Sequence, residues 1–292
     1  ARLQSGVLQT FTNDNTIFDH NLVLTGQYDL SEKVGFNFTL GGTTRGEIFE
    51  RNGANSDTQQ VFGVLRHFNF ANTLPIQFTS QRNIAGLYAQ IETDYDNWVF
   101  LTLAGRNDWV SNFAADNRSL FYPSASISIL PTEVISGLKG NVLNYLKLRG
   151  GIGTSANFET QSAFPVATVL NLDVQDFTDS AGNNLISQQV GEILGNPNLK
   201  PETLREIEVG IESRWWDSRI SLDISLFTRV TSDLIIQQPL DPATGFSLTN
   251  TNIGEVTNDG IEVALGVDFF RANNQGGFNW NSSMNFTALD PV

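Results

Sequence analysis

Ten segments of this chain alternate apolar and polar side chains, which limits them to strands with one apolar face. In residues 219–229, Ile220 and Leu222 fall on one side of an extended backbone, whereas Ser221 and Asp223 fall on the other. Most segments are about ten residues long, which suits a tilted strand that crosses a bilayer. The other nine segments span residues 21–29, 33–40, 85–95, 98–106, 121–129, 145–153, 205–213, 260–270 and 278–286.

The connections between these segments alternate between short and long. The short ones are rich in Asp, Asn, Ser and Gly, which favour chain reversal, and lie at 28–33, 95–98, 215–219 and 271–276. The long ones lie at 45–82, 108–120, 155–202 and 232–256. An intermediate connection, 131–142, replaces one short turn and is expected to hold a helical turn. The pattern predicts an all-β antiparallel meander with its tight turns at one rim, as in transmembrane β-barrels.

Composition excludes several classes of protein. The chain has 17 basic and 31 acidic residues, a formal net charge of −14, so we expect no nucleic-acid partner. It has no cysteine, which removes disulfide scaffolds, thiol nucleophiles and thiolate metal sites. No apolar run approaches the roughly 18 residues of a transmembrane helix. A membrane barrel remains open, because its strands alternate and produce no such run.

A soluble sheet with one wet face would also alternate, so the pattern has more than one interpretation. The barrel is favoured because the polar face carries charge in mid-strand, as at Glu208 and Asp223, while the apolar face is continuous. The ten strands are also longer than the strands of a typical sandwich. The alternatives are a soluble β-rich surface adhesin or binding protein, and a surface glycosidase that uses paired carboxylates such as Glu206 and Glu208.

The barrel interpretation assigns three groups of residues. Mid-strand acids are expected to face a water-filled lumen: Glu206, Glu208, Glu212, Asp223, Glu262 and Asp268. Rings at strand ends are expected to form an interfacial girdle, although such rings also cap strands in soluble sheets: Trp98, Trp109, Tyr122, Trp215 and Trp216. Loop aromatics are candidates for contact with cargo or a lid, with packing among the loops as the favoured alternative: Phe158, Phe164, Phe177 and Phe246.

Motifs for catalysis or cofactor binding are absent from the sequence. The glycine-rich residues 150–155 lie inside an alternating strand and lack the lysine and the following helix of a phosphate-binding loop. His20 and His67 fall in no metal-binding or catalytic pattern. We therefore expect no catalytic residue, no cofactor and no metal, and a protein that is not an enzyme.

Four stretches resemble SusC/RagA-family TonB-dependent transporters of the Bacteroidetes outer membrane. Residues 195–236 contain the sequence Asn-Pro-Asn-Leu-Lys-Pro-Glu, which leads into a strand, a tight turn and another strand. Residues 100–133 contain Gly-Arg-Asn-Asp-Trp and Phe-Tyr-Pro-Ser, which narrow the match to the SusC/RagA branch. The other similar stretches are 143–157 and 252–265, and together the four cover most of residues 82–288.

The resemblance implies the C-terminal part of a 22-stranded barrel with an N-terminal plug. Ten strands cannot close such a barrel, so residues 1–292 are interpreted as a partial barrel domain that lacks the plug, the signal peptide and the TonB-engaging segment. The resemblance further implies import of a large glycan or peptide with TonB energy. It implies outer-membrane lipid and a SusD-like lipoprotein lid as partners, and suggests a dimer of transporter–lid pairs.

Overall fold

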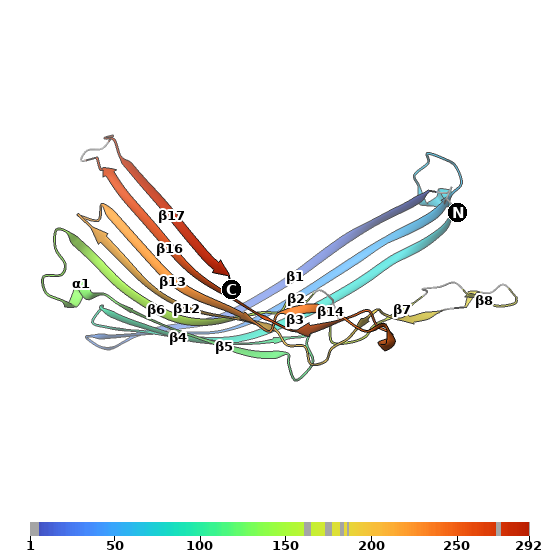
Figure 1. Cartoon of the computed structure of the whole chain (residues 1–292), viewed down its shortest axis with the longest axis horizontal. Coiled ribbons are helices and arrows are strands. Elements are labelled where there is room, and N and C mark those ends of the chain that lie inside the picture. The colour runs from blue at the N-terminus through green and yellow to red at the C-terminus, as the bar shows by residue number, and fades with distance from the viewer. Residues whose placement is uncertain are drawn as a thin grey trace.

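The computed structural model describes residues 6–160, 165–172, 177–181, 184–185, 187–272 and 276–291. Ten of its strands form one antiparallel sheet, and each pairs with the next of the ten along the chain. Figure 1 shows a long, curved sheet with β1 and β17 at its two edges. The predicted all-β antiparallel meander is confirmed. The ten strands are β1 (Val7–Ser31), β2 (Val34–Gln59), β3 (Phe70–Tyr95), β4 (Val99–Val110), β5 (Ser119–Ile129), β6 (Leu143–Asn157), β12 (Glu202–Trp215), β13 (Ile220–Ser232), β16 (Glu255–Phe270) and β17 (Trp280–Pro291).

The first three strands have 25, 26 and 26 residues and are more than twice as long as predicted. The expected long connection at 45–82 is wrong, because β2 continues to Gln59 and β3 starts at Phe70, which leaves only 60–69 as the connection. Strand β4 ends at Val110, which pairs with Ile84 of β3. Beyond this pair, β1, β2 and β3 continue to pair with one another and project beyond the rest of the sheet (Figure 1). Polar side chains lie on both faces of this extension, as Glu47 and Glu50 do on β2, so the sequence there lacks the regular alternation of the other strands.

The tight turns at the opposite rim follow from local backbone preference. Asp96 and Asn97 have φ of 48° and 59°, a left-handed geometry that lets the turn between β3 and β4 follow the twist of the two strands. Lys33 of the neighbouring turn forms an ion pair with Asp96 at 3.1 Å. The intermediate connection holds α1 (Pro131–Val134), which is the predicted helical turn. None of the helices among the described residues is long and apolar enough to cross a membrane.

The long connections fold against one another at the other rim. Strand β15 (Leu248–Asn252) pairs with β14 (Ile235–Pro239) on one side and with β11 (Ile193–Leu194) on the other, which joins two connections into one small sheet. The remaining short elements are β7 (Leu170–Leu172) paired with β10 (Gln188–Val190), β8 (Phe177–Thr178) paired with β9 (Asn184–Leu185), and the 3-10 turns η1 (His67–Asn69) and η2 (Pro242–Thr244).

Apolar burial is concentrated where these connections meet the sheet. Val110, Phe113 and Leu199 form a buried cluster, and partly buried Phe158 and Ile235 pack against it. The apolar face of the sheet, in contrast, is open: Leu87 is 60% exposed and Ile207 is 49% exposed. Within the described residues no second sheet covers this face, as a soluble sandwich would require.

Candidate functional site

Two neighbouring rows of side chains show how the sheet separates its faces. Strand register places Ile129, Leu148, Ile211, Ile224, Val263 and Phe286 opposite one another across six strands. One residue along, the register places Ser128, Arg149, Gly210, Ser225, Glu262 and Thr287 opposite one another. Because successive side chains point to opposite faces, the first row belongs to an apolar band and the second to a polar face.

Arg149 is the centre of the polar face. Its Nη1 and Nη2 donate to the two carboxylate oxygens of Asp223, each at 2.9 Å, and its Nε donates to Glu208 Oε1 at 3.2 Å. Nη2 also donates to Ser225 Oγ at 2.5 Å, and that hydroxyl donates to Glu208 at 3.0 Å. One guanidinium therefore neutralises two carboxylates in mid-strand, in the two-pronged geometry that favours Arg over Lys.

Gly210 makes this arrangement possible. Arg149 lies on β6 and Asp223 on β13, and β12 runs between them. A Cβ at Gly210 would stand 2.8 Å from Arg149 Nε and 3.1 Å from the Ile224 carbonyl oxygen, so a larger residue here would displace the Arg149 side chain from this path.

The six predicted lumen-facing acids all lie on this polar face. Glu206 is paired with Arg229, Glu212 accepts from Arg214 at 3.1 Å and Asp268 accepts from Arg271 at 2.6 Å. Glu262 is exposed and stands opposite Ser225. The structure thus brings the six acids onto one face. It spaces them along three strands, and in the part of the chain that it describes they do not form a single pocket.

Tyr122 was predicted to belong to an interfacial girdle, and that prediction is wrong. Its hydroxyl donates to Asp108 Oδ2 and accepts from Arg106 Nε at 3.0 Å, so its ring lies on the polar face. Arg106 also donates to Thr43 Oγ1 at 2.8 Å, and Asp108 is almost fully buried. The sequence could have placed Tyr122 on this face, because side chains two residues apart on a strand share a face and Tyr122 is two residues from the polar Ser124.

The four tryptophans of the predicted girdle lie at or next to strand ends, as that interpretation requires. Trp109 is near the loop end of β4, on the face opposite Asp108, and is 38% exposed. At the tight-turn rim, Trp98 packs edge-on against Tyr95 with ring centroids 6.2 Å apart. The rings of Trp215 and Trp216 are 6.3 Å apart at the same rim. Contact of these rings with lipid headgroups stays a prediction.

Of the four predicted loop aromatics, the structure describes the side chains of Phe158 and Phe246. Phe158 meets Phe113 edge-on at 6.5 Å and packs against the buried cluster, which supports the alternative of packing among the loops. Phe246 is partly buried between η2 and β15, and its role stays a prediction. Phe164 and the side chain of Phe177 lie outside the described residues.

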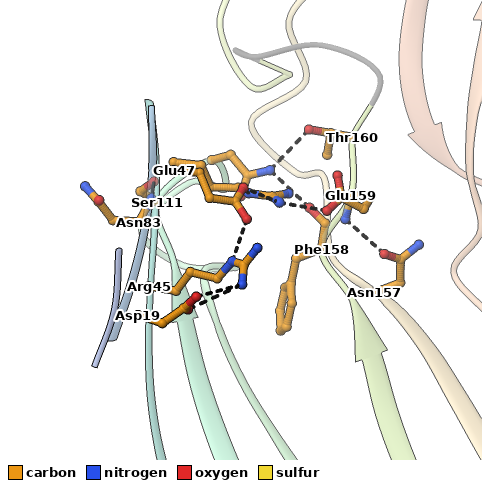
Figure 2. Close-up of polar contacts among 11 residues, drawn as sticks. Asp19, Arg45, Glu47, Asn83, Ser111, Asn157, Phe158, Glu159 and Thr160 are labelled. Carbon is orange, nitrogen blue, oxygen red and sulfur yellow. Dashed lines mark hydrogen bonds and ion pairs between the residues drawn. The ribbon is translucent and has the colours of Figure 1, made fainter. Parts of the chain in front are cut away.

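A chain of ion pairs crosses the base of the strand extension (Figure 2). Arg45 donates to Asp19 at 3.2 Å and to Glu47 at 2.6 Å. Arg82 donates to the other oxygen of Glu47 and, at 2.7 Å, to Glu159 at the start of the long connection after β6. Burial alone would raise the pKa of the Glu47 carboxyl, but the hydrogen bonds from Arg45 and Arg82 hold this pKa below its ordinary value.

Two stretches that carried the family resemblance bind each other. Lys200 N donates to Asn252 Oδ1, and Asn252 Nδ2 donates back to the Lys200 carbonyl, both at 2.8 Å. Asn196 Nδ2 donates to the Asn250 carbonyl at 2.9 Å, and Leu199 is completely buried between them and the sheet. The motif beginning at Asn196 therefore fastens one long connection to the next, a role that no local spacing in the sequence reveals.

A sheet with an apolar band on one face and an ion-paired polar face on the other is the wall of a membrane β-barrel. Residues 2–291 match the family model described as TonB dependent receptor-like, beta-barrel, and the chain belongs to this family of outer-membrane proteins. Within this family, the chain is 31% identical over 204 residues to a TonB-dependent receptor of Formosa agariphila. The aligned residues make up 69% of this chain and 20% of that receptor.

The chain is also similar in sequence to SusC and in fold to a structure of RagAB. The chain is 25% identical over 213 residues to TonB-dependent receptor SusC of Bacteroides thetaiotaomicron, covering 72% of this chain and 21% of SusC. A structure of the RagAB peptide importer superposes with a TM-score of 0.84 at 18% identity, over 97% of this chain and 30% of that one. The chain thus spans about a fifth of the length of these two curated relatives.

Proposed function

We propose that the protein containing this chain imports a large nutrient, a glycan or a peptide, across the outer membrane with energy from TonB. The observation that carries this proposal is the wall itself, whose apolar band matches lipid while its other face is charged, hydrogen-bonded and suited to water. The six mid-strand acids then face the lumen, and the four tryptophans lie at the two membrane interfaces. The RagAB relative is called a peptide importer, which makes peptide one of the two cargo classes.

Deletion of the gene from the source bacterium tests the proposal. We expect loss of growth on one class of polymer or peptide, with growth on its monomers unchanged and restored by the intact gene. Dissipating the inner-membrane proton gradient should stop uptake while leaving surface binding in place. Uptake that survives either treatment contradicts energy-coupled import.

A SusD-like lipoprotein lid is the proposed partner, and the tip of the β2–β3 hairpin is the proposed contact. This tip, residues 60–69, exposes five apolar side chains that no described element covers: Val61, Phe62, Val64, Leu65 and Phe68. Phe62 is 97% exposed and Phe68 is 84% exposed. The tip projects far beyond the apolar band, so lipid does not cover it, and apolar patches of this kind mark protein contacts.

The backbone under this surface is held in place by polar contacts. His67 contacts Thr10 Oγ1 at 2.7 Å through Nε2 and Ser56 Oγ at 2.9 Å through Nδ1. Asn69 donates to the carbonyls of Val61 and Val64. A preorganised apolar surface loses little entropy on binding.

Replacement of Phe62 and Phe68 by serine tests the lid contact. We expect co-purification of the lipoprotein with the receptor to fall at least tenfold, while yield and heat resistance of the barrel stay unchanged. A matched control replaces the exposed Phe121, which lies on β5 away from the tip. Undiminished co-purification contradicts this contact, and native mass measurement of the intact complex tests the proposed dimer of transporter–lid pairs.

A further inference from the structure

Arg205 places a positive charge on the apolar face of the sheet. It lies on β12 two residues from Ile207, and side chains two residues apart on a strand share a face. Ile207 and Val209 of that face are 49% and 54% exposed and belong to the apolar band. In the ten strands of the sheet, every other Arg or Lys lies on the polar face: Arg45, Arg51, Arg82, Arg106, Lys147, Arg149, Arg214 and Arg229.

Arg205 lies at the boundary of the apolar band, on the side of the long connections. On four neighbouring strands, β6, β12, β13 and β16, the apolar run of the outward face ends at Ile152, Ile207, Leu226 and Ile261. The next outward side chains, two residues further along, are Thr154, Arg205, Thr228 and Asp259. The longer loops of outer-membrane barrels are extracellular, so this boundary lies at the headgroups of the outer leaflet.

The other members of this polar row have partners within the sheet. Thr154 Oγ1 donates to the Pro123 carbonyl at 2.8 Å, and Thr228 Oγ1 donates to Asp259 Oδ1 at 2.7 Å. Arg205 is exposed and forms no hydrogen bond or ion pair with the part of the chain that the structure describes.

Neighbouring strands offer Arg205 no counter-charge on the same face. The residues directly opposite it are Thr154 on β6 and Val230 on β13. The nearest outward carboxylates, those of Asp259 and Glu255, lie two strands away on β16. The positive charge of Arg205 is therefore left for a group outside the wall to neutralise.

We propose that Arg205 binds a phosphate group of an outer-leaflet lipid. A guanidinium presents a planar fork of N–H donors that matches two phosphate oxygens. Its aliphatic stem can lie along Ile207 while the charged end extends to the level of the headgroups. A cation on the lipid face costs least near the interface, which is where Arg205 lies.

The position of Arg205 favours a lipid over other anions. The wall separates Arg205 from the polar face, so cargo that moves along that face does not reach it. The acyl chains of a lipid contact the apolar band and hold its headgroup at the boundary. Its phosphate therefore has a high effective concentration at Arg205, which a freely diffusing phosphate ion lacks.

Native mass spectrometry of the full receptor in detergent, after removal of co-purified lipid, tests the site. The probes are diphosphoryl lipid A, the same lipid with its phosphates removed, and inorganic phosphate. Diphosphoryl lipid A should bind to the wild type, and its affinity should fall about tenfold in Arg205→Gln. Arg205→Lys should keep part of the affinity, because it preserves the charge but loses the two-pronged geometry. The matched control is Arg214→Gln, which changes an arginine of the same strand on the polar face and should bind the lipid as the wild type does.

Each outcome supports or overturns the inference. Equal binding of diphosphoryl lipid A by the wild type and Arg205→Gln overturns it, and so does equal binding of the phosphorylated and dephosphorylated lipids by the wild type. Displacement of the lipid by inorganic phosphate at the same concentration would indicate a site for free anions and also overturn it. Asp259→Asn should leave the affinity unchanged or raise it, because a nearby negative charge is lost. A tenfold loss in that variant would place the site at the carboxylate instead.

Discussion

At the scale of single residues, the polar face depends on a few arginines that each hold several acids. Arg149 binds Glu208, Asp223 and Ser225, and Arg82 binds Glu47 and Glu159. Such a residue contributes more to stability than a single surface ion pair does, because its removal leaves two carboxylates close together with no cation between them.

Replacement of Arg149 by alanine should destabilise the barrel. Glu208 and Asp223 would then repel each other on a partly buried face, at a cost of about 1–3 kcal/mol. Urea unfolding of the full receptor in detergent, followed by tryptophan fluorescence, measures this change. The matched control is Arg214→Ala, which loses one ion pair, with Glu212, and a contact with the Tyr145 ring, and should cost about 1 kcal/mol or less. Equal effects of the two variants would contradict the central role of Arg149.

Glu47 should make the base of the strand extension sensitive to acid. Its pKa in the folded protein is lowered, so its contribution to stability is complete above the ordinary value of 4.5 and is lost as pH falls through the lowered value. Glu47→Gln removes this contribution. The unfolding midpoint of the variant should lie below that of the wild type at about pH 7, and the two should converge towards about pH 3. A constant difference across this range would refute the assignment.

At the scale of strands, β12 has no side chain at Gly210, and Arg149 of β6 therefore reaches across β12 to Asp223 on β13. Gly210→Val should block this path and separate Arg149 from Asp223, at a cost of about 1–3 kcal/mol. In the Arg149→Ala background the same substitution should cost much less, because the contact is already lost. A double-mutant cycle on the full receptor measures this coupling, and additive costs would contradict it.

The ten strands were predictable from sequence, because an apolar band over a polar face forces alternation. The extension of β2 and β3 was not, since beyond the band both faces of a strand meet water and the alternation disappears. The six acids could be placed on one face by counting in twos. Arg149 could not be identified as the partner of Glu208 and Asp223, because the residues that it contacts are up to 76 residues away in the chain.

At the scale of the whole molecule, the apolar band determines the solvent in which this chain is stable. Leu24, Leu103, Val209 and Met284 are all between 46% and 59% exposed, and they lie on strands spread across the sheet. An apolar surface this continuous is incompatible with a monomer in water.

The purified chain should therefore require an amphiphile. Without detergent, size-exclusion chromatography should show aggregates, because the apolar band and the unpaired edges of β1 and β17 are both exposed to water. With detergent or lipid, the aggregate should decrease. A monodisperse chain in plain buffer would favour the soluble adhesin over the membrane wall.

The extension of the β2–β3 hairpin is long, so a small change of angle at its base moves its tip by a large distance. Beyond the last register pair between β3 and β4, it continues from residue 46 to residue 59, about 45 Å at roughly 3.3 Å per residue. Pairing with β1 on one side keeps it stiff. A tilt of about 5° at its base would carry the tip about 4 Å by this geometry. A small change of angle at the ion pairs around Glu47 would therefore move Phe62 by about 4 Å.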